Sequence, residues 1–273
     1  MMTRPLPSTG EALPVVGLGT WQTFDIGEKP AERAQRAEVL RVLFEAGGSV
    51  IDSSPMYGAA ESVVGDLLTA ARSRDKAFVA TKVWTSGRDA GVEQMKRSMQ
   101  RMAADPIDLI QVHNLVDWRT HLATLRAWKA EKRVRYIGVT HYTPSAHAEL
   151  EAVMRAEQFD VVQLNYAIDD RLAEERLLPL AAERGMAVLV NQPFGGGGLI
   201  RKLIGRPLPG WAGEIGAASW AQILLKFVLG HPAVTCVIPG TSRPEHMKDN
   251  AAAGSGPLPD TAMRRRMAAE IGA

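Results

Sequence analysis

Short apolar runs rich in β-branched residues alternate along this chain with longer segments of helical periodicity. This alternation is typical of a parallel α/β fold. The predicted strands lie near residues 15–18, 49–52, 77–82, 107–112, 134–139, 160–164, 186–190 and 234–238. The predicted helices lie near residues 31–46, 59–71, 89–104, 119–132, 144–156, 173–184, 217–230 and 244–253. Because the eight strand–helix units are evenly spaced, they favour a closed (β/α)8 TIM barrel over an open sheet.

Two segments depart from the repeating pattern. Residues 4–14 precede the first barrel strand, and a short β-hairpin around residues 8–11 is expected to close the bottom of the barrel. Residues 191–216 form one long irregular insertion that contains glycine at every position from 195 to 198. An insertion of this length in a compact domain is more often functional than accidental. We find no internal repeat or linker and expect one domain that spans residues 1–273.

Length and composition agree with this architecture. A chain of 273 residues suits one barrel of about 250 residues. The net charge of +2 gives no reason to expect a nucleic acid or an anionic membrane as partner. The lone Cys236 excludes an internal disulfide and fits a reducing compartment. No apolar run approaches the ~20 residues of a membrane span, and no metal site is predicted. We expect a cytoplasmic protein that acts as a monomer.

Four polar residues lie where a barrel of this type carries its active site, at the C-terminal ends of the strands. Asp52, Lys82 and His113 close the second, third and fourth predicted strands, and Tyr57 lies in the loop after the second. Taken singly, each has an ordinary explanation, such as a helix cap, a solvated lysine or a core histidine. At adjacent strand ends, they predict one site where a carboxylate, a phenol, an ammonium and an imidazole converge.

These four side chains suit proton transfer to a carbonyl oxygen. A phenol with a pKa near 10 is a poor acid at neutral pH, but a nearby ammonium lowers that pKa. Asp52 is the natural anchor for Lys82, and His113 can donate a hydrogen bond to the substrate oxygen. No side chain donates hydride, so reduction would need a nicotinamide cofactor.

Two other functions stay open on this evidence. Lys82 could instead be the Schiff-base nucleophile of an aldolase, which borohydride trapping would reveal. Alternatively, the barrel could bind a nicotinamide without catalysis, as a sensor or as a subunit of a larger assembly. Such a binder has no need of Tyr57, so the complete set of four favours a reductase.

Residues 51–58 (IDSSPMYG) with Glu61 and Gly65, Lys82 further on, and residues 110–113 (IQVH) resemble the signature segments of the aldo-keto reductase superfamily. Weaker similarity is found in residues 14–21, 137–140, 162–165 and 238–241, so the resemblance runs from about residue 8 to residue 250. It implies NAD(P)H-dependent reduction of aldehyde or ketone carbonyls. Tyr57 would be the general acid, Lys82 and Asp52 would lower its pKa, and His113 would orient the substrate.

The resemblance also implies a cofactor site in the strand-end loops. Thr140 and Gln163 occupy positions that hold the nicotinamide carboxamide, and His141 stands where many relatives carry Asn. Asn191 replaces a stacking Tyr of many relatives, which leaves Phe194 as the aromatic candidate. The implied cofactor-binding residues are Gly19, Thr20, Trp21, Thr140, His141, Gln163, Asn191, Gln192, Pro193, Phe194, Gly195, Gly197, Ile238, Pro239, Gly240, Thr241, Ser242, Arg243, His246 and Asn250.

The expected phosphate contacts point to NADPH, with NADH as a possible substitute. The glycine run 195–198 can expose backbone N–H groups to a pyrophosphate. Many relatives carry a basic pair at the positions of Gly240 and His246, and this chain lacks it. Arg243, at the start of a predicted helix, can bind the 2′-phosphate of NADPH in its place.

Three tryptophans predict the substrate pocket. Trp21, Trp84 and Trp118 follow the first, third and fourth strands, where they would form a flat, apolar wall. The expected partner is therefore a small-molecule carbonyl compound.

Overall fold

Eight parallel strands form one sheet in the order β10-β9-β8-β7-β6-β5-β4-β3 in the computed structural model, which describes residues 1–272. Bridges from Val16 to Val237 and from Gly19 to Gly240 join the two edge strands, so the sheet closes into a barrel. The strands are β3 (Leu18–Gly19), β4 (Val50–Asp52), β5 (Phe78–Val83), β6 (Ile107–His113), β7 (Val134–His141), β8 (Val161–Asn165), β9 (Ala187–Asn191) and β10 (Cys236–Val237). The predicted (β/α)8 TIM barrel is confirmed.

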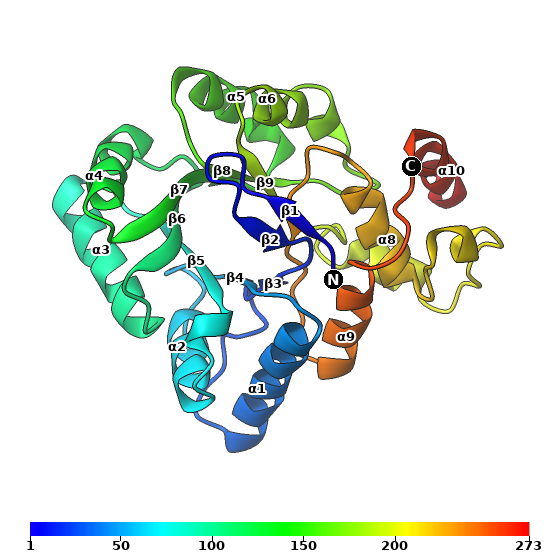
Figure 1. Ribbon diagram of the computed structural model, residues 1–273, viewed down its shortest axis with the longest axis horizontal. Helices are drawn as coiled ribbons and strands as arrows, with labels where there is room; N and C mark the ends of the chain where they lie inside the picture. The colour runs from blue at the N-terminus through cyan, green and yellow to red at the C-terminus, as the bar shows by residue number, and fades with distance from the viewer. Residues whose placement is uncertain (273) are drawn as a thin grey trace.

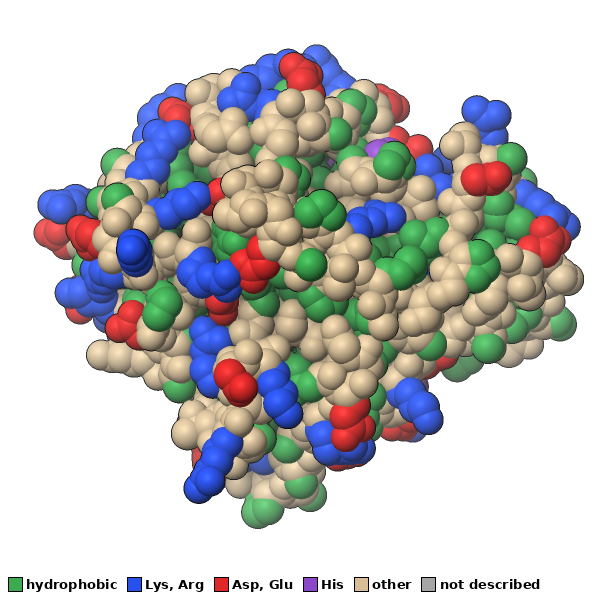
Figure 2. All heavy atoms as spheres, in the orientation of Figure 1, with side chains coloured by type: hydrophobic (Ala, Val, Ile, Leu, Met, Phe, Trp, Pro, Cys, Tyr) green, Lys and Arg blue, Asp and Glu red, His purple; other side chains and the backbone are tan. Residues whose placement is uncertain are grey.

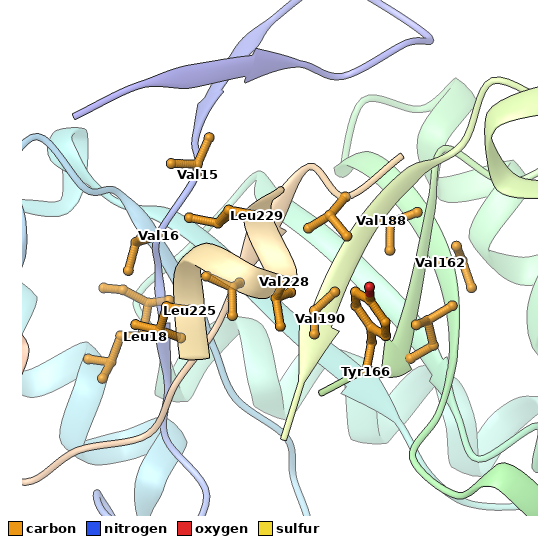
Figure 3. Packing of buried hydrophobic residues seen from close by; sticks show 14 of the residues in the cluster. Val15, Val16, Leu18, Val162, Tyr166, Val188, Val190, Leu225, Val228 and Leu229 are labelled. Atoms are coloured by element: carbon orange, nitrogen blue, oxygen red, sulfur yellow. The ribbon is translucent and has the colours of Figure 1, made fainter. Parts of the chain in front are cut away.

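Helices surround the barrel and follow the strands in turn (Figure 1). They are α1 (Pro30–Glu45), α2 (Ala60–Ala70), α3 (Arg88–Arg101), α4 (Trp118–Ala130), α5 (His147–Ala156), α6 (Leu177–Glu183), α7 (Gly198–Leu203), α8 (Trp220–Leu229), α9 (Pro244–Ala252) and α10 (Thr261–Ile271). Apolar residues on the outer face of the strands pack against these helices. Figure 3 shows α8 contributing Leu225, Val228 and Leu229 to a layer that also holds Val16, Leu18, Val188 and Val190.

A hairpin closes one end of the barrel, as predicted. Strands β1 (Thr3–Pro5) and β2 (Ala12–Pro14) pair antiparallel and lie across the middle of the ring in Figure 1. Leu6 and Leu13 are buried from this hairpin into a cluster with the inward-facing residues of the strands. Figure 2 shows the same face with basic and acidic side chains interspersed on its surface, in keeping with the small net charge.

The inward-facing residues are apolar near the beginning of the strands and polar near their ends. Because strand side chains alternate between two faces, Val50 and Asp52 share one face of β4, and Phe78 and Lys82 share one face of β5. The pairing register then aligns the polar ends: His113 lies beside Thr140, and Thr140 lies beside Gln163. The barrel is therefore apolar at the hairpin end and polar at the opposite end.

The segment 191–216 differs from the irregular insertion expected there. It contains α7 and a 3-10 turn at Ala212–Ile215. Leu199 and Leu203 are both buried, and their spacing places them on one face of α7. The preceding glycine run masked this short helix in the sequence pattern. Helix α10 was also not predicted, because no strand precedes it and the strand–helix alternation gives no signal there.

Three predicted helices begin later than expected. The helix predicted from residue 217 begins at Trp220 in α8, and the other two follow 3-10 turns. Residues 144–146 and 172–174 form 3-10 turns, and α5 and α6 start only after them. Thr143, directly before the first of these turns, makes no side-chain cap bond and instead contacts His141 and Ser145. None of the helices in the described part of the chain combines the length and apolar character needed to cross a bilayer.

Candidate active site

An ion pair is buried at the polar end of the barrel. Lys82 Nζ donates to Asp52 Oδ2 at 2.6 Å and to the carbonyl oxygen of Ser53 at 2.7 Å. Both charged side chains are shielded from solvent, with Lys82 fully buried. Buried charges are tolerated when they are paired and hydrogen-bonded, and this pair meets both conditions.

Two amides complete the surroundings of Asp52. Its Oδ1 accepts hydrogen bonds from Gln111 Nε2 at 3.1 Å and from Gln163 Nε2 at 2.9 Å. Sequence reasoning assigned Gln163 to the cofactor and gave Gln111 no role. The alternation of β6 offered the signal for Gln111, because it shares a face with His113. The carboxylate is therefore held by three side chains from three different strands.

The aromatic members of the site gather around this ion pair. Lys82 Nζ lies 5.2 Å from the centre of the Tyr57 ring. The rings of Tyr57 and His113 meet edge to face with their centres 6.0 Å apart. The structure thus brings the four predicted catalytic residues into one small volume, although Lys82 lies one position before the end of β5.

Burial and the neighbouring charges set the protonation states. Burial and the Lys82 ammonium lower the pKa of the His113 imidazole to about 2, so this ring is neutral at physiological pH. Burial alone would lower the pKa of Lys82, but Asp52 and Tyr57 together raise it above its usual value. Lys82 is therefore held as an ammonium, which is the opposite of what a Schiff-base nucleophile needs.

Tyr57 differs from expectation. Burial is the largest influence and raises the pKa of the phenol, Lys82 lowers it, and Asp52 raises it again. The net pKa is raised, whereas the sequence argument expected it to be lowered, because that argument left out burial. The phenol consequently keeps its proton at neutral pH in the free protein.

Several implied nicotinamide contacts lie beside the ion pair. Gln163 Oε1 accepts from Thr140 Oγ1 at 3.3 Å and from Asn191 Nδ2 at 3.4 Å. Asn191 Oδ1 is buried and has no partner within residues 1–272. A carboxamide N–H₂ is the kind of donor that such an orphaned acceptor lacks. The residues present therefore fit a nicotinamide amide.

The glycine run after β9 has a strongly curved backbone. Gly195, Gly196 and Gly197 all have positive φ angles of 56°, 62° and 86°, a region where side chains other than glycine are strained. The Asp169 carboxylate lies against Gly195, and the Arg201 guanidinium lies against Gly197. Arg201 is a basic group that sequence reasoning missed, because it belongs to the unpredicted helix α7.

The loop after β10 leads into α9. Arg243 is 57% exposed at its side chain and pairs with Glu245 at 2.6 Å, so its charge already has a partner. From α1, Arg36 donates to the carbonyl oxygens of Thr23 at 2.6 Å and Ser242 at 3.3 Å. Arg36 thereby ties the loops after β3 and β10 together. These long-range contacts have no signature in the sequence.

The remaining implied cofactor residues occupy the same strand-end loops. Asn250 in α9 is buried, whereas His246 is exposed. The others, whose cofactor contacts stay predictions, are Gly19, Thr20, Trp21, His141, Gln192, Pro193, Phe194, Ile238, Pro239, Gly240 and Thr241.

The three predicted pocket tryptophans differ in position. Trp84 is 42% exposed, and its ring centre lies 6.5 Å from that of His113. Gln94 fixes its backbone by accepting from the Trp84 N–H at 2.6 Å and donating to the Trp84 carbonyl at 3.0 Å. Trp21 is exposed on the loop after β3, whereas Trp118 begins α4 and packs against the core. Met56, 40% exposed beside Tyr57, is a pocket candidate that sequence reasoning missed.

A model of the Aldo/keto reductase family matches residues 15–270. The chain belongs to the aldo/keto reductase family. Membership confirms the resemblance carried by residues 51–58, Lys82 and His113, and makes the chain an NAD(P)H-dependent oxidoreductase that acts on aldehyde or ketone carbonyls.

Individual relatives of this aldo/keto reductase span nearly its whole length. Methylglyoxal reductase YeaE of Escherichia coli is 30% identical over 92% of this chain and 89% of its own. An NADH-specific methylglyoxal reductase of the same organism is 25% identical over 93% of both chains. The crystal structure of an aldo-keto reductase from Klebsiella pneumoniae in complex with NADPH superposes with a TM-score of 0.81, at 26% identity over 98% of this chain and 94% of that one.

Proposed function

We propose that this reductase reduces small aldehydes and ketones with NADPH, and that Tyr57 is its proton donor. The observation that carries the proposal is the buried Lys82–Asp52 ion pair beside Tyr57 and His113. When bound, the nicotinamide supplies the hydride that adds to the carbonyl carbon. The proton for the carbonyl oxygen then comes from the chain itself.

Each catalytic side chain has a distinct part in this transfer. The neutral His113 donates a hydrogen bond to the carbonyl oxygen and polarises it. Tyr57 gives its proton to that oxygen as negative charge develops there. The Lys82 ammonium stabilises the resulting phenolate, and Asp52 keeps Lys82 charged and in place.

The cofactor would lie along the ends of β7, β8, β9 and β10. Thr140, Gln163 and Asn191 would hold the carboxamide, and the glycine run with Arg201 would face the pyrophosphate. Arg243 would bind the 2′-phosphate after leaving Glu245. The Klebsiella pneumoniae complex supports NADPH, whereas the NADH-specific Escherichia coli relative makes NADH a plausible second cofactor.

The ratio of kcat/KM for NADPH to that for NADH tests the role of Arg243. Arg243→Ala should lower this ratio about tenfold, because a charge-assisted contact with the 2′-phosphate is lost. Glu245→Gln should raise it, since Arg243 then has no competing partner. Arg265→Ala removes another exposed arginine, on α10, and serves as the control. An unchanged ratio in Arg243→Ala would exclude this role.

The proposed substrates are aldehydes and dicarbonyls, the latter suggested by the relatives named as methylglyoxal reductases. The exposed rings of Trp21 and Trp84 favour compounds with an apolar or aromatic body. We further propose that residues 1–273 act as one domain, as a monomer, in the cytoplasm.

Isotope transfer tests the reaction class. NADPH deuterated at nicotinamide C4 should yield an alcohol with deuterium on the former carbonyl carbon, across a panel of aromatic and aliphatic aldehydes and dicarbonyls. Cofactor binding without turnover on any substrate would contradict the proposal and point to a sensor. A covalent adduct on Lys82 after borohydride treatment with a carbonyl compound would instead indicate an aldolase.

A further inference from the structure

Ser54 contacts the imidazole of His113 from within the signature segment. Its Oγ lies 3.1 Å from His113 Nδ1. Ser54 is fully buried, and His113 is 5% exposed. No comparison or motif assigns a role to this serine, which lies three positions before Tyr57.

The direction of this hydrogen bond follows from counting donors and acceptors. The backbone N–H of Met56 donates to Ser54 Oγ at 3.4 Å, so the hydroxyl oxygen already serves as an acceptor. A serine hydroxyl has one proton to give. Within residues 1–272, His113 Nδ1 is the one hydrogen-bond partner of this hydroxyl that can accept its proton.

The opposite arrangement leaves a buried donor unsatisfied. If Nδ1 carried the proton and donated to Ser54, the hydroxyl proton would have no acceptor among the described residues. Buried donors without partners are unfavourable and rare. A neutral imidazole carries one proton, so an accepting Nδ1 places that proton on Nε2. The low pKa of His113, caused by burial and Lys82, keeps the ring neutral.

We propose that Ser54 is a positioning residue that holds His113 in the Nε2–H tautomer. Nε2 has no hydrogen-bond partner within residues 1–272, so its N–H is free to meet a substrate oxygen beside Tyr57 and Trp84. Without Ser54, the ring could place its proton on Nδ1 and present a bare acceptor to the carbonyl oxygen, which would repel it. The inference rests on the proposed reduction, in which His113 donates to that oxygen.

Nitrogen NMR of the protein labelled with ¹⁵N-histidine tests the tautomer directly, without any need for turnover. The His113 signals are assigned by their loss in His113→Asn. The wild type should show a protonated Nε2 and an unprotonated Nδ1, and Ser54→Ala should shift the population toward Nδ1–H. Ser54→Thr keeps a hydroxyl and should restore the wild-type pattern.

Kinetics provide the second readout. Ser54→Ala should lower kcat about tenfold, the loss expected for one weakened hydrogen bond, while KM for NADPH stays unchanged. Ser98→Ala is the matched control, because Ser98 is also buried but its Oγ has no partner in the described residues. This control should leave both kcat and the His113 signals as in the wild type.

The outcomes separate this inference from the proposed function. A wild-type His113 with its proton on Nδ1, or an unchanged tautomer in Ser54→Ala, would overturn the positioning role. Failure of the reductase proposal would instead appear as absent turnover in the wild type, with the tautomer pattern intact.

Discussion

The two ends of the barrel interior are both buried, but they are filled by opposite chemistry. At the hairpin end, the inward-facing residues are apolar, with Leu6 and Leu13 closing over Val50, Phe78 and Leu109. Further along the same strand faces, the interior holds Asp52, Lys82, Gln111 and Gln163 in one hydrogen-bonded group. Apolar contacts are non-directional, whereas a buried charge depends on each of its partners. The hairpin end should therefore govern stability alone, and the polar end should govern both stability and activity.

Removing one member of the ion pair should have the largest effect. Lys82→Met should lower kcat/KM by about 10²–10⁴-fold, since Tyr57 loses its charged neighbour. It should also reduce the free energy of unfolding by about 3–5 kcal/mol, because Asp52 is left buried without its counter-charge. Adding Asp52→Asn should recover much of this stability but none of the activity. Urea unfolding and NADPH oxidation measure the two quantities.

The variant that combines Lys82→Met with Asp52→Asn shows whether the lost stability comes from the unpaired charge of Asp52. If the double variant is less stable than Lys82→Met, the lost stability does not come from the unpaired Asp52 carboxylate alone. A fully active single variant would remove Lys82 from the mechanism.

At the hairpin end, Leu13→Ala should reduce stability by about 2–5 kcal/mol, because it leaves a cavity in the apolar layer. The kcat of the folded fraction should stay unchanged, since no catalytic group contacts Leu13. Ile204→Ala, at a position 77% exposed, should change stability by less than about 0.5 kcal/mol. Loss of activity in folded Leu13→Ala would show that the two ends are coupled.

Acid should lower the stability of the whole protein through His113, which lies at the polar end of the barrel. The pKa of His113 is lower in the folded protein than in the unfolded chain, so the unfolded chain binds a proton first as pH falls. Below about pH 6.5, this group should cost about 1.4 kcal/mol of stability per pH unit. His113→Asn should flatten that slope between pH 6.5 and 5. Parallel curves for the two proteins over this range would contradict the buried neutral state.

The four proposed catalytic side chains could be located in the sequence because their residue types and their positions at strand ends both point to one site. Asp52, Lys82 and His113 follow apolar strands, and Tyr57 falls in the intervening loop. The strand alternation of β6 could have indicated Gln111, which shares a face with His113, but its contact with Asp52 depends on the pairing of strands in the barrel. The contact between Ser54 and His113 has no such signal in the sequence. The raised pKa of Tyr57 was not predicted, because burial outweighs the charge of Lys82 and the extent of burial is known only from the fold.

The barrel itself followed from the alternation of strands and helices, and the strand positions agree closely with the structure. Helices α7 and α10 were not predicted, because neither occupies a regular place in that alternation. The ties made by Arg36 and Gln94 join segments through side-chain contacts that no local pattern signals.

The most direct test of proton donation by Tyr57 compares the wild type with Tyr57→Phe in NADPH oxidation coupled to alcohol formation. Cofactor binding is measured on the same samples. We expect the variant to bind NADPH as the wild type does, because only one hydroxyl is removed, and to lose about 10²–10⁴-fold in kcat. Equal turnover in the two proteins would contradict the assignment of Tyr57 as the proton donor.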